Sequence, residues 1–362
     1  MFLGTVGRRG GYYGRRMGNR RRVGGVRVGD KWKHTGAASV EGTASRREKV
    51  PLGAGYRRAG KTGWSVGMVG VGTSRLSRID STCRQTVADA LQAGCNVLHS
   101  SGNFQNGEAQ SVLGEVLGET LENGDIRREE VVLVSQGGTF QGGELECLKD
   151  KLEDVRRDWQ EGDDHRKNDL IIEVNPTLWC SFSPALLRQQ LERSLEDLGV
   201  ETLDVFLLEY PELLLSRGPN VLSSPPSSPD SLSTSSPPHH TQDRRAQVRD
   251  HLRQSFSYLE SEVQRGRLQY YGVVSDTLGF PPTHAGHTHL GELLRLAEEA
   301  SSSDECHFGA VLYPCNLLEG STVTDSTQRW EGEGSQGPAM LPASEWARRA
   351  DLFRLTSRSL DA

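Results

Sequence analysis

The residues best suited to proton transfer lie near the carboxyl ends of two predicted strands. His99 lies in the strand predicted for residues 96–101, and Glu209 in the strand predicted for residues 202–210. A histidine and a carboxylate that meet across the mouth of a sheet can act as an acid and base pair. The alternative is a rim histidine and a solvated glutamate, because polar residues are common where strands end. The sequence alone leaves both interpretations open.

The loop after His99 has the position of a catalytic loop without the usual acid and base. Residues 96–117, NVLHSSGNFQNGEAQSVLGEVL, predict a strand, a polar loop rich in Gly and Asn, and a helix. Loops at the carboxyl ends of strands hold the chemistry of α/β barrels. Between strand and helix, however, the ionisable side chains are His99 and Glu108, and the one aromatic residue, Phe104, has no hydroxyl.

Composition narrows the class of protein. A chain of 362 residues suits one barrel of roughly 250 residues with extensions. A net charge of −6 and a pI near 6.0 give no attraction to nucleic acid or an anionic membrane, and no apolar run has the length of a bilayer span. The six cysteines form no C-x-x-C pair, which favours reduced thiols over disulfides or a zinc site. We expect the sequence HAGHTH (284–289) to be an exposed loop without a metal ion.

The first 50 residues differ in composition from the rest of the chain. Residues 1–29 contain eight arginines and no acidic residue. An Arg-rich, acid-poor segment is typical of an organellar transit peptide, and the alternative is a disordered basic arm. Because serine is scarce here, the sequence favours a mitochondrial destination, with the plastid as the second choice.

From residue 56 to residue 362, short apolar strands alternate with amphipathic helices. Seven strands are predicted, at residues 67–73, 96–101, 130–136, 202–210, 268–275, 308–316 and 352–359. Near-continuous apolar strands separated by amphipathic helices indicate a parallel sheet that is buried on both faces. Two insertions interrupt this pattern. Residues 146–169 are dense in charge and predict a solvated helix, and residues 217–242 are rich in Ser and Pro and predict disorder.

Several segments carry the motifs of a known family, beginning with YRRAGKTGWSVGMVGVGT (56–73) and NGEAQSVLGEVL (106–117). The first resembles the opening hairpin and first strand, and the second a loop and the second helix, of the aldo/keto reductase superfamily of NADP-dependent oxidoreductases. SLEDLGVETLDVFLLEYPE (194–212) and GRLQYYGVVSD (266–276) are similar to two of its signatures. The sequences GGTFQGG (137–143) and PCNLLEG (314–320) suggest a divergent branch.

The resemblance implies a (β/α)8 barrel of the TIM type that uses NADPH to reduce small carbonyl compounds. Residues 359–362, SLDA, resemble part of the seventh strand, so the eighth strand is missing from this sequence. A parallel barrel without one strand has two unpaired edges. We expect the Arg-rich N-terminal residues or a partner protein to cover them, unless the sequence itself is truncated.

The resemblance also implies a substituted catalytic tetrad. In the family, a Tyr hydroxyl donates a proton to the carbonyl that receives the hydride, a Lys lowers the pKa of that Tyr, an Asp pairs with the Lys, and a His orients the carbonyl. The Asp position carries His99, the Tyr position Phe104, the Lys position Gln136, and the His position Glu209. All four residues of the tetrad are therefore replaced.

The cofactor positions implied by the family are also altered. Ser275 matches a family serine, but Asp276 stands where an Asn amide would serve the nicotinamide carboxamide. Leu312 replaces a Gln and cannot form a hydrogen bond through its side chain. NADPH is thus the cofactor implied by resemblance, with its expected contacts weakened.

Three functions follow as hypotheses. The chain is an aldo/keto reductase-like protein whose carbonyl reduction is lost or weakened, or a non-catalytic interaction module in an organelle. The third hypothesis is a remodelled enzyme that uses His99 and Glu209 as its acid and base.

Overall fold

A computed structural model describes most of the region that the sequence assigns to the barrel. The described residues are 34–50, 55–158, 171–215, 220–221, 239–303, 305–331 and 338–359. Residues 1–33, which hold most of the predicted transit peptide, lie outside them, as do residues 159–169 of the charged insertion and residues 217–219 and 222–238 of the Ser/Pro-rich insertion.

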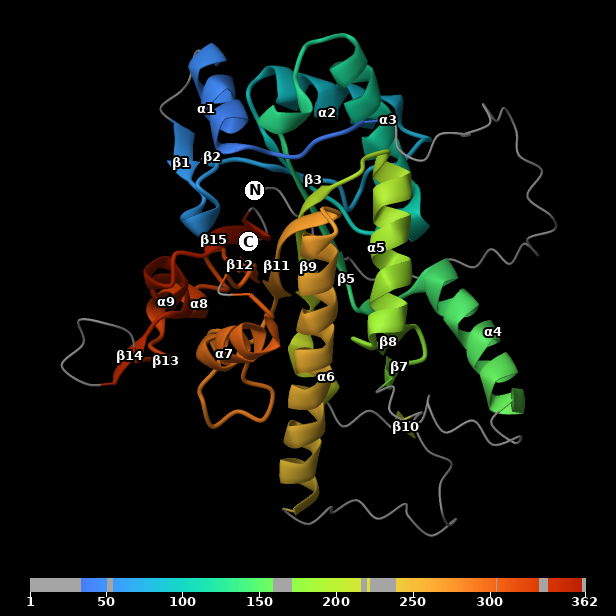
Figure 1. Cartoon of the computed structure of the whole chain (residues 1–362), viewed down its shortest axis with the longest axis vertical. Helices are drawn as coiled ribbons and strands as arrows, with labels where there is room; N and C mark the ends of the chain where they lie inside the picture. Colours follow the sequence, from blue (N-terminus) through green and yellow to red (C-terminus); the bar gives the residue numbers. More distant parts are fainter. Residues whose placement is uncertain are drawn as a thin grey trace.

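The centre of the fold is a curled sheet of seven parallel strands (Figure 1). Its strands are β3 Val71–Gly72, β4 Val97–His99, β5 Val132–Gly137, β9 Leu203–Glu209, β11 Leu268–Val274, β12 Phe308–Pro314 and β15 Phe353–Ser357. They lie side by side in chain order, and every neighbouring pair is parallel. The predicted fold class, an α/β fold consistent with a (β/α)8 barrel that lacks one strand, is confirmed.

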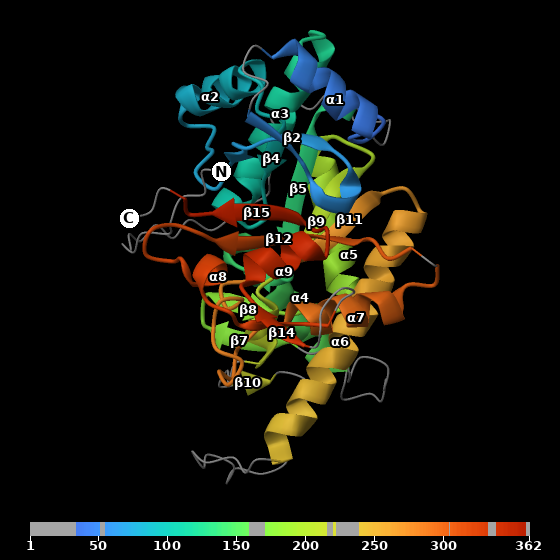
Figure 2. The same ribbon diagram turned by 90° about the vertical axis from the view of Figure 1, so that its left-hand side faces the viewer.

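Helices connect the strands and cover the outer face of the sheet (Figures 1 and 2). They are α2 Ser81–Gln92, α3 Glu108–Glu122, α4 Gly142–Asp158, α5 Pro184–Leu198, α6 His239–Gln264, α7 Leu290–Ala300, α8 Ser321–Thr324 and α9 Ala343–Arg349. Local signals set their ends: the Asp80 carboxylate accepts the N–H of Thr82 at the start of α2, and α5 begins at Pro184 and ends at left-handed Gly199.

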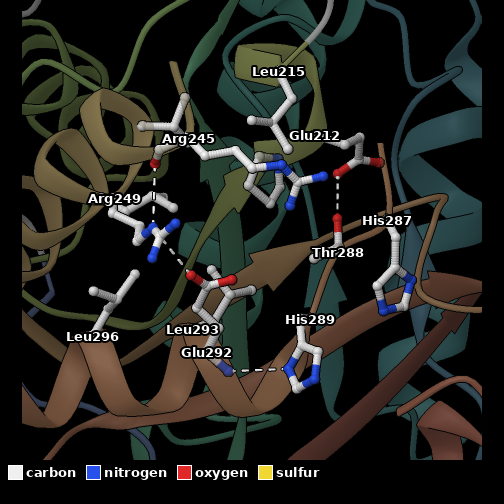
Figure 3. Close-up of a pocket in the computed structure, with 13 residues that line it drawn as sticks. Glu212, Leu215, Arg245, Arg249, His287, Thr288, His289, Glu292, Leu293 and Leu296 are labelled. Atoms are coloured by element: carbon white, nitrogen blue, oxygen red, sulfur yellow. Dashed lines mark hydrogen bonds and ion pairs between the residues drawn. The ribbon is translucent and has the colours of Figure 1, made fainter. Parts of the chain in front are cut away.

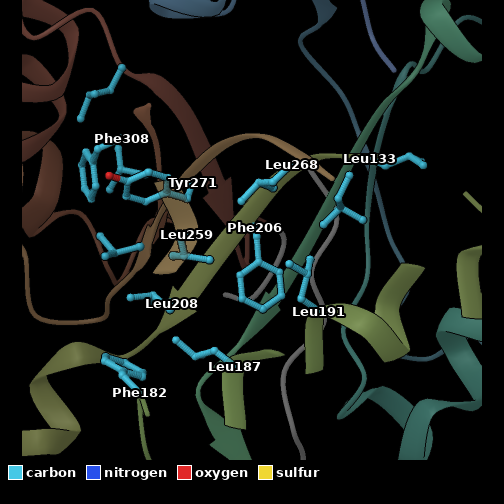
Figure 4. Close-up of a cluster of buried hydrophobic side chains, with 14 of the residues drawn as sticks. Leu133, Phe182, Leu187, Leu191, Phe206, Leu208, Leu259, Leu268, Tyr271 and Phe308 are labelled. Carbon is cyan, nitrogen blue, oxygen red and sulfur yellow. The ribbon is translucent and has the colours of Figure 1, made fainter. Parts of the chain in front are cut away.

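Alternate residues of each strand enter two different apolar clusters. Val132 and Val134 of β5 point into the curled sheet, whereas Leu133 packs against the helices. The outer cluster contains Phe206 and Leu208 of β9 together with side chains of α5 and α6 (Figure 4). Both faces of the strands are therefore buried, which explains their near-continuous apolar sequences.

A hairpin closes the amino end of the curled sheet. Strands β1 Tyr56–Arg58 and β2 Ser65–Gly67 pair in antiparallel fashion. Between them, Trp64 packs edge-on against Tyr270 of β11, with ring centroids 5.3 Å apart, and against Phe353 of β15. The predicted strand 67–73 is therefore divided between the hairpin and the two-residue strand β3.

Residues 34–50, which the sequence analysis included in a transit peptide or a disordered arm, are ordered in the structure. Helix α1 Val40–Lys49 begins at Ser39, whose hydroxyl accepts the Gly42 N–H, and the Ala38 N–H donates to the buried Asp204 carboxylate at 2.7 Å. The helix has no apolar stripe: its buried residues include Thr43 and Arg46, which is why hydrophobic periodicity missed it.

The two insertions differ from their predictions in part. The charged insertion is helical as far as Asp158, at the end of α4. A small antiparallel sheet was not predicted; it contains β6 Thr139–Phe140, β7 Ile172–Asn175, β8 Leu178–Cys180 and β10 Asn220–Val221. The Ser/Pro-rich insertion thus includes β10, and α6 begins within its last residues, at His239. A second unpredicted hairpin, β13 Gln328–Trp330 and β14 Ala339–Leu341, precedes α9.

The described helices include none that is both long enough and apolar enough to cross a lipid bilayer.

Candidate functional site

Three of the predicted site residues point into the curled sheet from adjacent strands. His99 ends β4, Gln136 lies near the end of β5, and Glu209 ends β9. Gln136 shares the inner face with Val134, because alternate residues of a strand share a face. The apolar residues Val274, Leu312 and Leu355 continue this layer on β11, β12 and β15. One half of the layer is polar and the other half is apolar.

The polar half forms a directed chain of hydrogen bonds. The Gln136 amide donates from Nε2 to Oε1 of Glu209, and its carbonyl oxygen faces Nε2 of His99 at 2.8 Å. In this arrangement the neutral His99 ring carries its proton on Nε2 and donates to Gln136. Nδ1 of His99 is then a buried acceptor, and it has no hydrogen-bond partner among the described residues.

Two further residues, Asn103 and Thr139, complete the environment of Glu209. The Thr139 hydroxyl donates to Oε2 of Glu209, and Nδ2 of Asn103 donates to the same oxygen at 3.3 Å. Asn103 also donates to the backbone carbonyl of Thr139 at 3.0 Å. The sequence analysis did not select either residue. The only sequence signal that could have indicated them is their position: Asn103 directly precedes Phe104, and Thr139 lies two residues past the end of β5.

Phe104 completes the set of four tetrad positions. It begins the 3-10 helix η3 Phe104–Gly107, and its ring meets the His99 ring edge-on, with centroids 5.7 Å apart. The next two residues, Gln105 and Asn106, have φ values of 51° and 56°, in the left-handed region that non-glycine residues seldom adopt. Gln105 donates to the Ser74 carbonyl. The strained loop therefore holds a ring that has no proton to donate.

Burial displaces the pKa values of the two ionisable residues in opposite directions. Desolvation raises the pKa of Glu209 to about 7, although hydrogen bonds from Thr139 and Gln136 oppose the shift. Desolvation lowers the pKa of His99 to about 4, opposed by its hydrogen bond to Gln136. Near neutral pH, Glu209 is therefore partly protonated, whereas His99 is neutral.

The hypothesis of a direct acid and base pair needs a correction. The structure brings His99 and Glu209 to one site, but the Gln136 amide lies between them and bonds to both. An amide does not titrate, so the two residues do not share a proton through it. Their side chains are also enclosed: His99 is 2 %, Gln136 6 % and Glu209 3 % exposed.

The predicted cofactor residues do not fit a nicotinamide carboxamide. Oδ2 of Asp276 accepts a hydrogen bond from Arg358 at 2.8 Å, and Arg358 also binds Glu319. The Ser275 hydroxyl accepts the Thr277 N–H, and Leu312 is buried in the inner apolar cluster. The carboxylate is thus held by an ion pair, and the leucine offers no polar atom.

The model of the aldo/keto reductase family matches residues 65–279, more than half of the chain. A 42-residue segment is 50 % identical to rho crystallin of Rana temporaria, covering 11 % of this chain and 13 % of that protein. The NADH-specific methylglyoxal reductase of Escherichia coli (strain K12) is 21 % identical over 165 residues, which are 45 % of this chain and 42 % of that enzyme. These matches span less than half the length of each relative.

Among solved structures, the chain is similar to a glycerol dehydrogenase of Gluconobacter oxydans, with a TM-score of 0.47 and 16 % identity over 84 % of this chain and 63 % of that one. It is also similar to a Bombyx mori aldo-keto reductase in complex with NADP, with a TM-score of 0.43 and 14 % identity over 83 % of this chain and 65 % of that one. The family match runs from β2, the second strand of the hairpin, to the residues just after β11, and it includes the candidate site and the strands that carry it. This chain belongs to the aldo/keto reductase family.

Proposed function

We propose that this chain is an aldo/keto reductase-like protein in which NADPH-dependent reduction of small carbonyl compounds is lost or strongly weakened. One observation carries the proposal: at the family's catalytic positions, Gln136 forms hydrogen bonds with both His99 and Glu209, and the Phe104 ring packs against His99. No phenol and no ammonium stands at these four positions.

Typical rate factors and energies of buried polar groups support the loss of activity. A positioned general acid contributes roughly 100- to 10,000-fold to a rate, and Phe104 cannot act as one. A carbonyl that entered the site would also compete with internal bonds, and a buried polar group left unpaired costs about 1–3 kcal/mol. The ion pair of Asp276 with Arg358 weakens the case for cofactor binding independently.

The test is an NADPH oxidation assay on a panel of aldehydes and ketones. The natural chain is compared with a variant that carries His99→Asp, Phe104→Tyr, Gln136→Lys and Glu209→His, and with a family enzyme. We expect the natural chain to turn over at least about 100-fold more slowly than the family enzyme. Turnover at a comparable rate would contradict the proposal.

NADPH binding is measured separately, by fluorescence. Binding without turnover supports a protein that has lost only its acid. Absence of binding by the natural chain and by the fourfold variant supports the non-catalytic interaction module instead. The single variants Phe104→Tyr and Phe104→Leu form a matched pair, because the first adds a hydroxyl and the second removes the ring.

A second candidate function is acid and base catalysis centred on Glu209. It is favoured by the pKa of Glu209, about 7, and by the unpartnered Nδ1 of His99, which can accept a hydrogen bond from a bound hydroxyl and so position it. A panel of esters and hydroxy ketones tests it. Activity should follow a midpoint near pH 7, vanish in Glu209→Gln and persist in Glu298→Gln, which alters an exposed glutamate of α7. Full activity in Glu209→Gln would exclude this role.

A further inference from the structure

A cavity lies outside the layer of His99, Gln136 and Glu209 and shares no residue with that layer. It has a volume of about 60 Å³ and is enclosed by the 3-10 helix η7 Pro211–Leu215, by α6, by residues 287–289 and by the first turns of α7 (Figure 3). Its apolar floor includes Val248, Leu252 and Leu296. One water molecule needs about 10–15 Å³, so the space suits a group of several atoms.

Two arginines face the cavity from α6. Arg245 and Arg249 are four residues apart and therefore lie on the same side of the helix. Arg245 donates from Nη2 to the carbonyl of Ala285 at 3.2 Å, and Nε of Arg249 lies 3.3 Å from Oε1 of Glu292. A guanidinium has five N–H donors, so these contacts leave most of them available for a ligand.

Two histidines face the cavity from the opposite side (Figure 3). The loop 284–289 was expected to be exposed, but His287 is only 8 % exposed. Backbone groups of Thr277 and Phe280 lie within reach of its ring, but neither ring nitrogen forms a well-aligned hydrogen bond among the described residues. The imidazole therefore keeps hydrogen-bonding capacity for a ligand that reaches it. His289 accepts the Glu292 N–H at Nδ1, so in the neutral ring Nε2 carries a proton that can be donated.

Two acidic residues, Glu212 and Glu292, line this cavity, but they do not make its net charge negative. Glu212 accepts hydrogen bonds from the Asp276 N–H at 2.9 Å and from the Thr288 hydroxyl at 3.2 Å. Burial raises the pKa of Glu212 to about 7, so near neutral pH a large fraction of it is uncharged. The other acidic group, Glu292, is paired with Arg249.

We propose that this cavity binds a small phosphate-type oxyanion, held by Arg245, Arg249 and His287. Arginine forms strong bidentate bonds with phosphate, and donors from two sides match an ion with several acceptor oxygens. If the ion is an ester, its carbon atoms have an apolar floor to rest on. The shared chemistry is that of a phosphate group, carried either by free phosphate or by a small monoester.

The test is calorimetric titration of the full chain with inorganic phosphate and, separately, with phenyl phosphate at constant ionic strength. We expect saturable binding that weakens about tenfold or more in Arg245→Gln, since a charge-assisted hydrogen bond contributes about 1.5–3 kcal/mol. Arg253→Gln is the matched control, because Arg253 lies two turns further along α6 and pairs with Glu299 on the surface. It should leave the affinity unchanged.

The outcomes separate the two sources of the phosphate group. Tighter binding of phenyl phosphate supports an ester, and equal or tighter binding of inorganic phosphate supports the free ion. Shifts of the His287 ring signals in the NMR spectrum on addition of phosphate would support the site without any substitution. Absence of saturable binding by both compounds, or equal affinity in Arg245→Gln and the natural chain, would overturn the proposal.

Discussion

Glu209 and His99 connect the candidate site to the pH dependence of stability. The pKa of Glu209 rises from 4.5 to about 7 on folding, so its contribution to stability is present at low pH and is lost as the pH rises through about 7. The pKa of His99 falls from 6.5 to about 4, so its contribution is present above pH 6.5 and is lost as the pH falls through about 4. The two residues therefore change the free energy of unfolding with pH in opposite directions.

Replacing Glu209 by Gln tests this linkage. Gln cannot bind or release a proton, so the melting temperature of Glu209→Gln should fall less than that of the natural chain between pH 5 and pH 8. Part of the fall will remain, because burial also raises the pKa of Glu212 to about 7. Melting curves across this range measure the effect, with Glu298→Gln as the control at an exposed site. If the melting temperature of Glu209→Gln falls as much as that of the natural chain, Glu209 is ionised across the whole range from pH 5 to pH 8.

The candidate site could be predicted from the sequence only in part. The ends of two recognisable strands place His99 and Glu209 at one site, and the resemblance to the family adds Gln136 to them. The hydrogen bonds from Asn103 and Thr139 and the ion pair of Asp276 with Arg358 were not predicted. These contacts join residues 70 to 106 positions apart, and no local period in a sequence encodes such distances.

The close contact between α3 and α5 requires glycine at position 114. A Cβ atom there would lie 2.2 Å from the backbone oxygen of Asp197, in the last turn of α5. Alanine gains about 1 kcal/mol of helix propensity, but the collision with a backbone atom must move a whole helix. We expect Gly114→Ala to lower the free energy of unfolding by about 2 kcal/mol in denaturant titrations.

Gly143 of α4 provides the control for this substitution. No atom lies within 4 Å of a Cβ at that position. Gly143→Ala should therefore leave stability unchanged or raise it by up to about 1 kcal/mol. If Gly114→Ala is equally well tolerated, the helices separate more easily than their packing indicates.

Asp204 of β9 attaches the segment before the hairpin to the sheet. Its carboxylate accepts the Ala38 N–H and the Leu133 N–H, both at 2.7 Å, and pairs with the buried Arg128 guanidinium at 2.8 Å. Asn in its place would leave Arg128 buried without an opposite charge. Breaking a buried ion pair in this way costs about 3–5 kcal/mol.

We therefore expect Asp204→Asn to lower the free energy of unfolding by about 3 kcal/mol in denaturant titrations. Asp250→Asn, at an exposed residue of α6, should change it by less than about 0.5 kcal/mol. A chain that starts at residue 51 should also melt at a lower temperature than one that starts at residue 34, since it lacks the partner of Asp204. Equal melting temperatures would mean that residues 34–50 add nothing to the fold.

The elements that the sequence predicted are the long ones. Each strand of the main sheet was predicted because helices and inner residues bury both of its faces, which selects a continuous apolar run. The strands of the small sheet are two to four residues long, too short for a period of two to appear. Helix α1 buries threonine and arginine, so its sequence has the composition of a solvated segment.

The seven-stranded sheet has two edges within the described residues. Strand β15 pairs only with β12, and β3 pairs only with β4, whereas β9 lies between β5 and β11. A cavity of about 480 Å³ lies beside β15, bounded by residues of the β1–β2 hairpin. Phe353, Arg354, Leu355 and Thr356 of β15 line this cavity, whereas β9 has a paired strand on each side.

Hydrogen exchange followed by mass spectrometry can compare the edge of the sheet with its centre. Opening an edge strand breaks one ladder of hydrogen bonds, and opening a central strand breaks two. We expect amides of β15 to exchange at least about tenfold faster than amides of β9, since tenfold corresponds to only about 1.4 kcal/mol of opening free energy. The amides of Leu312 and Tyr313 lie in β12, one strand further from the edge. Their exchange rates should lie between those of β15 and β9. Equal protection of β15 and β9 would contradict an open edge and would indicate that another segment or a partner protein pairs with β15 in the full chain.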